Sequence, residues 1–199
     1  FRSMKIRVGS TNWKNDVERV KEVRNAVGPD IELMADINQA LEPKQAIQLG
    51  KKLEEYDLLW LEEPVASNNR EGHAEVRNSL SIPIASGENE YSLSGMREMI
   101  EAKACDILMP DLQRIGGISE MRKVANLAES HNLPISTHIF TEHSLSVAGS
   151  VTNCLSVEHM PWFSKLFNEQ IYVINGYIDI PERPGTGFTF NESYIKLIN

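Results

Sequence analysis

Short apolar runs alternate along the chain with longer segments of mixed polarity. Residues 4–8 alternate between apolar and polar side chains and end at Gly9, which predicts a β-strand. The same kind of run, bounded by turn residues, predicts further strands at 31–36, 57–62, 83–86, 106–109, 133–137 and 154–158. Seven strands are therefore expected in the part of the chain before residue 160.

Between these strands, apolar residues recur at the spacing of one helix face. In the first such segment valines recur in this way up to residue 27, and Asn15 or Asp16 is expected to cap the helix. Further helices are predicted at 43–55, 94–103 and 118–131. Strands that alternate with helices at this spacing are typical of a parallel sheet.

Polar residues recur at the carboxyl ends of the predicted strands. They are Asp36, Glu62, Glu88, Asp111, His138 and Glu158. In an open sheet such residues lie along a line, whereas in a (β/α)8 barrel they converge on one mouth, where catalysis takes place. We therefore predict an α/β fold of the (β/α)8 TIM-barrel type for residues 1–160. The turn-rich remainder, 161–199, is expected to be a C-terminal closing segment.

The overall charge narrows the class of ligand. The chain of 199 residues carries 20 Lys and Arg against 28 Asp and Glu, a net charge of −8. An acidic balance argues against nucleic acid as a partner, and no apolar run is long enough to span a bilayer. The two cysteines, Cys105 and Cys154, are expected to be buried thiols, as in a cytoplasmic protein. A small-molecule substrate is the expected ligand.

Three of the strand-end carboxylates have a regular spacing. Asp36, Glu62 and Glu88 are separated by 26 residues each, one strand–helix unit. On consecutive barrel strands such residues lie close enough to share a cation, and three hard oxygen ligands suit Mg²⁺. Glu63 could compete as a ligand, but strand neighbours point to opposite faces, so we expect it to face the outer layer. The predicted cofactor is Mg²⁺.

The next two strands end in a carboxylate and an imidazole. Asp111 follows one strand, and His138 ends the strand after it. A carboxylate beside a histidine fixes its tautomer and raises its basicity, which makes a usable general acid or base. We expect His138 and Asp111 to be catalytic, and His73, His131 and His143 to be structural.

Several motifs occur in the order and spacing of one known family: Lys5-Ile-Arg7-Val-Gly9, Asp36-Ile-Asn38-Gln39, Trp60-Leu-Glu-Glu-Pro64, Gly87-Glu88-Asn89, Asp111 with Ile115-Gly-Gly117, and His138. In these motifs the chain resembles the mandelate racemase branch of the enolase superfamily. The resemblance implies that Mg²⁺ on the three carboxylates stabilises an enediolate formed when the α-proton of a carboxylate substrate leaves. It also implies that Glu158 is a catalytic residue that hydrogen-bonds the substrate carboxylate, and that Asn38 binds the substrate.

The motif on the first predicted strand departs from that family. The usual pattern has two lysines flanking one residue, whereas this chain has Lys5 and then Arg7. Because arginine does not readily give up its proton, a racemase with a base on each face is disfavoured. We expect Arg7 and Lys5 to be catalytic through their charge, with Arg7 as an electrostatic clamp on the substrate or the enediolate and Lys5 tuning the charge beside it. The predicted reaction is therefore dehydration of a sugar acid to a 2-keto-3-deoxy acid, with racemisation or epimerisation of a 2-hydroxy acid as the alternative.

The resemblance also implies segments that this sequence does not contain. Family members carry an N-terminal capping domain, and we expect the chain to represent barrel strands two to eight, with the closing segment packing toward that cap. A homo-oligomer is expected for the full-length protein. Two other classes stay open: a retaining glycosidase using Glu62 and Glu88 without a metal, and a non-catalytic metal-binding barrel or pseudoenzyme.

Overall fold

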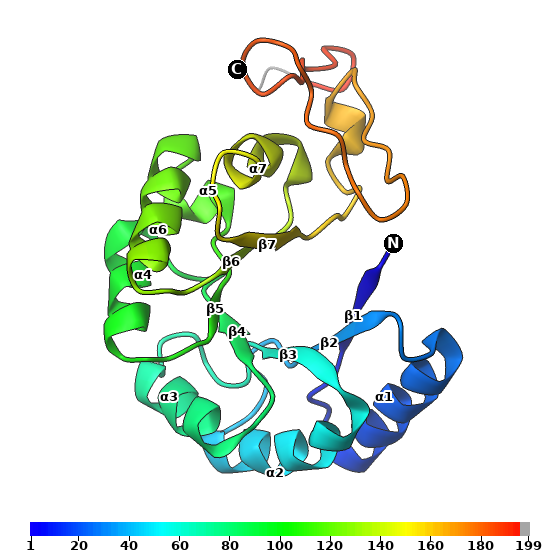
Figure 1. Ribbon diagram of the computed structural model, residues 1–199, viewed down its shortest axis with the longest axis vertical. Coiled ribbons are helices and arrows are strands. Elements are labelled where there is room, and N and C mark those ends of the chain that lie inside the picture. Colours follow the sequence, from blue (N-terminus) through cyan, green and yellow to red (C-terminus); the bar gives the residue numbers. More distant parts are fainter. Residues whose placement is uncertain (196–199) are drawn as a thin grey trace.

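The computed structural model describes residues 1–195 and contains one sheet of seven parallel strands. The sheet curls into part of a barrel, with its strands in sequence order from β1 to β7 (Figure 1). The strands are β1 (Ser3–Arg7), β2 (Glu32–Asp36), β3 (Leu58–Glu62), β4 (Ile84–Ser86), β5 (Ile107–Leu108), β6 (Ile135–Thr137) and β7 (Cys154–Val157). All seven lie within the predicted runs to within one or two residues, so the prediction of a (β/α) barrel is confirmed.

Helices follow the strands and cover the outside of the curled sheet (Figure 1). They are α1 (Trp13–Val27), α2 (Pro43–Leu53), α3 (Arg70–Ser79), α4 (Ser92–Glu101), α5 (Leu112–Ile115), α6 (Ile118–Ser130) and α7 (Thr141–Ala148), with 3₁₀ turns η1 (Glu54–Tyr56) and η2 (Ser164–Leu166). Among residues 1–195, no helix combines the length and the apolar composition needed to cross a membrane.

Two apolar layers form because side chains on a strand alternate between the faces of the sheet. The larger cluster lies between the sheet and the helices and contains residues such as Leu33, Leu61 and Ile84. A smaller cluster lies on the opposite face, inside the barrel, and contains Met34, Trp60, Ala85, Ile107 and Met109. On β2 and β3 the side chains two residues beyond Met34 and Trp60, those of Asp36 and Glu62, lie at the carboxyl ends of the strands, above this inner cluster.

The first helix begins earlier than the sequence predicted. Its first residue is Trp13, and Asn12 stands at the cap position, so neither Asn15 nor Asp16 caps it. Asp16 is fully buried, and its carboxylate accepts hydrogen bonds from the backbone N–H of Gly9 and Ser10, at 3.1 and 2.7 Å. The Asp16 carboxylate therefore binds the loop that follows β1, and the helix starts without a side-chain cap.

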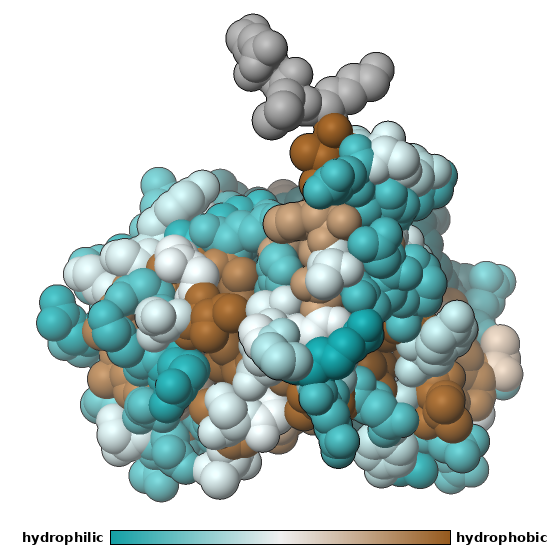
Figure 2. All heavy atoms as spheres, turned by 90° about the horizontal axis from the view of Figure 1, so that it is seen from above, coloured by the Kyte–Doolittle hydropathy of each residue, from teal (hydrophilic) through white to brown (hydrophobic). Residues whose placement is uncertain are grey.

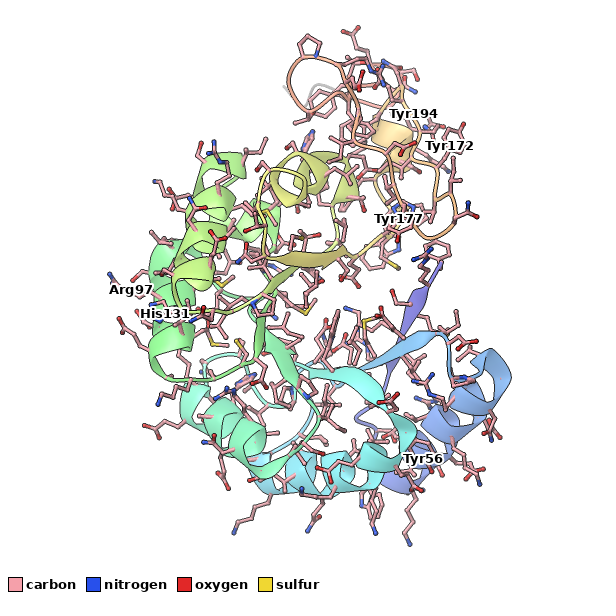
Figure 3. The ribbon with its side chains drawn as sticks, in the orientation of Figure 1. Tyr56, Arg97, His131, Tyr172, Tyr177 and Tyr194 are labelled. Carbon is pink, nitrogen blue, oxygen red and sulfur yellow. The ribbon has the colours of Figure 1, made fainter. Side chains whose placement is uncertain are left out.

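Residues 161–195 form an irregular segment beside the end of the barrel. Phe167 anchors it, since its ring is buried against Phe188 and Phe190. The segment also reaches the first strand: Arg2 donates to the Tyr177 hydroxyl at 2.7 Å, and its guanidinium lies over the Tyr177 ring. Figure 3 shows Tyr177 on this segment, facing the N-terminal strand. The contact links the two ends of the sheet.

Part of this segment exposes apolar side chains. Trp162, Tyr172 and Ile174 are at least 60% exposed. Figure 2, which views the molecule from above, shows apolar side chains among hydrophilic ones on this face. The exposed aromatic rings distinguish the segment from the barrel, whose large apolar residues are mostly buried.

Candidate active site

The strand register brings the predicted site residues to one mouth of the barrel. Arg7 of β1 pairs with Asp36 of β2, and Asp36 pairs with Glu62 of β3. On the other side, Asp111 and His138 form a parallel bridge just beyond the ends of β5 and β6. These five side chains come from five different strand–helix units of the chain, so the mouth is assembled by the fold rather than by local sequence.

The backbone turns sharply where several of these strands end. Asn38, Glu63, Ile139 and Phe140 all have positive φ angles, and Gly87 has a φ of 131°. Left-handed backbone is costly for residues other than glycine and is kept where surrounding contacts hold it. One such contact is visible at β2, where the Asn38 N–H donates to Asp36 Oδ1 at 2.7 Å. The turn thus fixes one oxygen of Asp36 and places Asn38 at the rim, exposed.

Each of the three equally spaced carboxylates is paired with a different cationic group. Lys5 Nζ lies 2.6 Å from Glu62 Oε1, and Arg7 Nη1 lies 3.3 Å from Asp36 Oδ2. Glu88 Oε2 lies 3.2 Å from His138 Nε2. The chain therefore gathers three acidic side chains at the mouth and compensates each of them separately.

Burial is the main influence on the protonation of these carboxylates. Asp36, Glu62 and Glu88 are each less than 10% exposed. Desolvation raises the pKa of Glu62 to about 7, against the opposing effect of Lys5. It also raises the pKa of Asp36 and of Glu88, and the nearby charge of Asp36 adds to both of the glutamate shifts. Such a cluster favours a cation among the oxygens.

The donor set suits a hard divalent cation. All three side chains offer only carboxylate oxygens, on adjacent strands, and Mg²⁺ prefers such ligands. As the side chains are oriented, no three His, Cys, Asp or Glu residues within the described range 1–195 form a ready-made cluster for an ion. Each carboxylate contacts its own cationic partner instead, so an ion bound by the carboxylates would have to replace these contacts.

Asp111 and His138 form a close pair opposite these carboxylates. His138 Nδ1 lies 2.7 Å from Asp111 Oδ2, and the other Asp111 oxygen accepts from the N–H groups of Gln113 and Arg114. Burial works to lower the pKa of His138, but the bond to Asp111 and the charges of Glu88 and Glu158 outweigh it and raise that pKa. Burial raises the pKa of Asp111, yet His138 and the backbone donors bring it below its usual value.

Lys5 bridges the two sides of the mouth. Besides Glu62, its ammonium contacts Glu158 Oε1 at 2.8 Å, although β1 and β7 are not paired in the sheet. Burial works against the charge of Lys5, but the two glutamates outweigh it and raise its pKa. The second Glu158 oxygen accepts from the Ile139 N–H at 3.2 Å. Lys5 is thus held as a cation between β3 and the end of β7.

Glu63 makes contacts on the outer side of the sheet. Its carboxylate accepts from Ser86 Oγ at 2.7 Å and from Asn89 Nδ2 at 2.9 Å. Ser86 Oγ also lies 3.2 Å from His73 Nε2 on α3, and burial lowers the pKa of His73. This buried network lies behind β4 and supports the turn that carries Glu88.

Two supporting residues were not identified from the sequence. Trp60 donates its indole N–H to Glu62 Oε2 at 2.9 Å, and Arg114 Nη1 donates to the Glu88 backbone carbonyl at 2.9 Å. The alternation of strand residues puts Trp60 on the same face as Glu62, two positions earlier, and that pattern could have revealed it. Arg114 lies on the short helix α5, for which the sequence has no periodic signal.

Other reactive side chains lie elsewhere. Cys105 and Cys154 are free thiols, and burial raises the pKa of Cys105 to about 12 and that of Cys154 to about 11. His131 is exposed at the end of α6, on the outer surface of the barrel together with Arg97 (Figure 3). The two cysteines and His131 do not line the barrel mouth.

Comparison with known proteins agrees with this geometry. A family model described as enolase C-terminal domain-like matches residues 1–194. L-talarate/galactarate dehydratase of Salmonella typhimurium is 36% identical over 189 residues, which cover 95% of this chain and 48% of that enzyme. The chain thus spans about half the length of this relative.

Solved structures have the same fold. The structure of L-talarate dehydratase from Polaromonas sp. JS666, complexed with Mg and L-glucarate, is 35% identical, with a TM-score of 0.93, and the match covers 96% of this chain and 54% of that one. A mandelate racemase/muconate lactonizing enzyme from the same organism is 34% identical, with a TM-score of 0.93, over 97% of this chain and 53% of that structure.

Proposed function

The chain belongs to the enolase C-terminal domain-like family, and from that premise we propose that the protein is a Mg²⁺-dependent sugar acid dehydratase. It would remove the proton α to the substrate carboxylate and release the β-hydroxyl as water, which leaves a 2-keto-3-deoxy acid. One observation carries the proposal: three buried carboxylates on consecutive strands face an aspartate–histidine pair across one mouth. The similarity to a talarate/galactarate dehydratase supports a sugar acid as substrate.

Asp36, Glu62 and Glu88 are the residues that would hold Mg²⁺. When bound there, the ion would stabilise the negative charge that develops on the substrate carboxylate as the α-proton leaves. The three side chains are buried at the ends of β2, β3 and just beyond β4, where little water competes for them. Their compensation by Lys5, Arg7 and His138 keeps this acidic cluster compatible with a folded barrel.

His138 is the residue that would move a proton. The Asp111 carboxylate accepts a hydrogen bond from Nδ1 of His138. The proton exchanged with the substrate therefore sits on Nε2 of His138, on the side facing the carboxylates. The raised pKa of His138 favours its charged form, which suits an acid that protonates the departing hydroxyl. The same nitrogen, once neutral, can take the α-proton.

Arg7 and Lys5 would supply fixed positive charge. The Arg7 side chain is 60% exposed and directed to the mouth by its contact with Asp36, and its guanidinium stays charged. It is therefore an electrostatic clamp for an anionic substrate and not a second base. Glu158 and Asn38, at the rim, are the proposed substrate-binding side chains.

The test uses the full-length protein with Mg²⁺ in D₂O, followed by proton NMR with a panel of sugar acids and simple 2-hydroxy acids. A deoxy-keto product establishes the dehydratase. Incorporation of α-deuterium without elimination supports the racemase alternative. Turnover of an acid that survives EDTA contradicts the role of the metal, whereas hydrolysis of a glycoside in the presence of EDTA favours a glycosidase. The absence of exchange and elimination with every acid favours a non-catalytic barrel.

We further propose that residues 161–199 are a closing segment that packs toward another part of the full-length protein, and that the protein is a cytoplasmic homo-oligomer. The exposed rings of Trp162 and Tyr172 support a contact of this segment with further protein. Residues 196–199 lie outside the described range. Size-exclusion chromatography with light scattering on the full-length protein measures the oligomeric state directly.

A further inference from the structure

Trp60 lies inside the barrel, directly below Glu62. It is 2% exposed and packs with Met34, Ala85, Ile107 and Met109 in the inner cluster. Its indole N–H donates to Glu62 Oε2 at 2.9 Å in a fully buried contact. A tryptophan in a barrel interior is usually a packing residue, but a buried indole N–H needs an acceptor, and here that acceptor is a proposed metal ligand.

The two oxygens of Glu62 have partners of different kinds. Oε1 accepts from Lys5 Nζ at 2.6 Å, and Lys5 also contacts Glu158. A lysine ammonium sits on a flexible stem and carries several donors, so it can turn to Glu158 alone. The indole has one donor on a rigid ring enclosed by the inner cluster, so it cannot follow another acceptor. Oε2 is therefore held permanently, whereas Oε1 is held by a group that can leave.

From this asymmetry we propose that Trp60 is a positioning residue, which makes Glu62 bind its cation through Oε1 alone. The inference rests on the proposed Mg²⁺ site. Mg²⁺ demands near-octahedral geometry, in which a carboxylate contributes one oxygen, whereas Ca²⁺ takes six to eight oxygens and accepts both oxygens of one carboxylate. By occupying Oε2, the indole favours the smaller ion. Trp60 thus contributes to the selectivity of the site as well as to the packing of the barrel.

Substitution of Trp60 separates these two roles. Trp60→Phe keeps an aromatic ring in the inner cluster and removes the donor. Met34→Leu is the matched control, because Met34 belongs to the same cluster and makes no hydrogen bond to Glu62. If Trp60 only fills space, both variants weaken Mg²⁺ and Ca²⁺ binding in the same proportion.

The experiment is isothermal titration of the full-length wild type and both variants with MgCl₂ and with CaCl₂. Supporting residues of metal sites typically change affinity by about 10–100-fold, and we expect Trp60→Phe to raise the Kd for Mg²⁺ by about tenfold. The Kd for Ca²⁺ should rise less, so the ratio of Kd(Ca²⁺) to Kd(Mg²⁺) falls, whereas Met34→Leu leaves that ratio unchanged. An unchanged ratio in Trp60→Phe overturns the inference. A wild type that binds no Mg²⁺ overturns the metal site itself.

A second measurement follows the hydrogen bond itself. The indole N–H of Trp60 gives its own ¹H–¹⁵N NMR signal, assigned by its loss in Trp60→Phe. If the bond to Oε2 is kept, this signal stays downfield and protected from exchange when Mg²⁺ is added to the full-length protein. Loss of that protection on adding Mg²⁺ shows that Oε2 leaves the indole and contradicts the inference.

Discussion

The buried charges on the two sides of the barrel mouth are compensated in different ways. On the side of β2 to β4, burial raises the pKa of all three carboxylates, and each has a cationic partner from elsewhere in the chain. On the side of β5 and β6, Asp111 and His138 compensate each other directly, and the pKa of the aspartate is lowered. In the proposed function, the first side takes up a cation and the second holds and releases a proton.

This difference predicts that the two sides can be disabled separately. The largest effect is expected for His138→Asn in the full-length protein, because loss of a general acid or base typically lowers the rate by about 10²–10⁴-fold. The Kd for Mg²⁺ should change much less than kcat, since His138 contacts the proposed ligand Glu88 but is not itself a ligand. Steady-state kinetics and Mg²⁺ titration check both values, with exposed His131→Asn as the control. A variant with unchanged kcat contradicts the role of His138.

Glu62→Gln tests the opposite side. It removes a charged ligand and should weaken Mg²⁺ binding by more than about 100-fold, beyond what supporting residues cause. The Asp111–His138 hydrogen bond should survive, as seen in an NMR signal of the imidazole. Glu32→Gln is the matched control, because Glu32 is exposed at the other end of β2. Equal Mg²⁺ affinities for Glu62→Gln and wild type rule out Glu62 as a ligand.

Asp16→Ala probes the support of the first strand's end. The substitution leaves the partly buried N–H groups of Gly9 and Ser10 without their acceptor, which costs at most about 1–3 kcal/mol of unfolding free energy. Denaturant unfolding measures the loss, and Glu18→Ala on the exposed face of α1 should change stability by no more than about 0.5 kcal/mol. Equal stability for the two variants means that the Asp16 contacts do not hold the loop.

The smallest expected effect concerns His73, which lies behind the carboxylate side. Burial lowers its pKa in the folded protein, so the unfolded chain binds the proton first as the pH falls below about 6.5. The contribution of neutral His73 to stability is complete above that pH and is lost as the pH falls toward the lowered value. Wild type should therefore lose stability relative to His73→Gln, by at most about 1.4 kcal/mol per pH unit. If the unfolding free energies of wild type and His73→Gln change in parallel between pH 7 and 5, this contribution of His73 is excluded.

Much of the fold could be predicted because each strand and helix has a local signal. The strand runs are bounded by turn residues, and the alternation of side chains separates the mouth residues from the outer layer. The equal spacing of Asp36, Glu62 and Glu88 placed them at equivalent strand ends, which the register of β2 and β3 bears out for the first two.

The partners of these residues could not be predicted in the same way. That Lys5 reaches both Glu62 and Glu158 depends on the curvature of the sheet, which brings β1 toward the end of β7 without pairing them. The predicted start of α1 was too late because aspartate is a residue type that commonly caps helices, whereas the Asp16 carboxylate accepts a hydrogen bond from the preceding loop. Contacts between side chains across the barrel depend on how strongly the sheet curls. The order of apolar and polar residues along the sequence does not specify that curvature.

The proposed function depends above all on a metal ion held by the carboxylate side of the mouth. The most direct measurement is anomalous diffraction from crystals of the full-length protein grown with Mn²⁺ in place of Mg²⁺. We predict one strong peak within coordination distance of Asp36, Glu62 and Glu88, with Lys5 Nζ turned away from Glu62 Oε1 and Trp60 still bonded to Oε2. A peak at other residues, or a Glu62 Oε1 that still contacts Lys5 Nζ at saturating Mn²⁺, would contradict the proposed metal site.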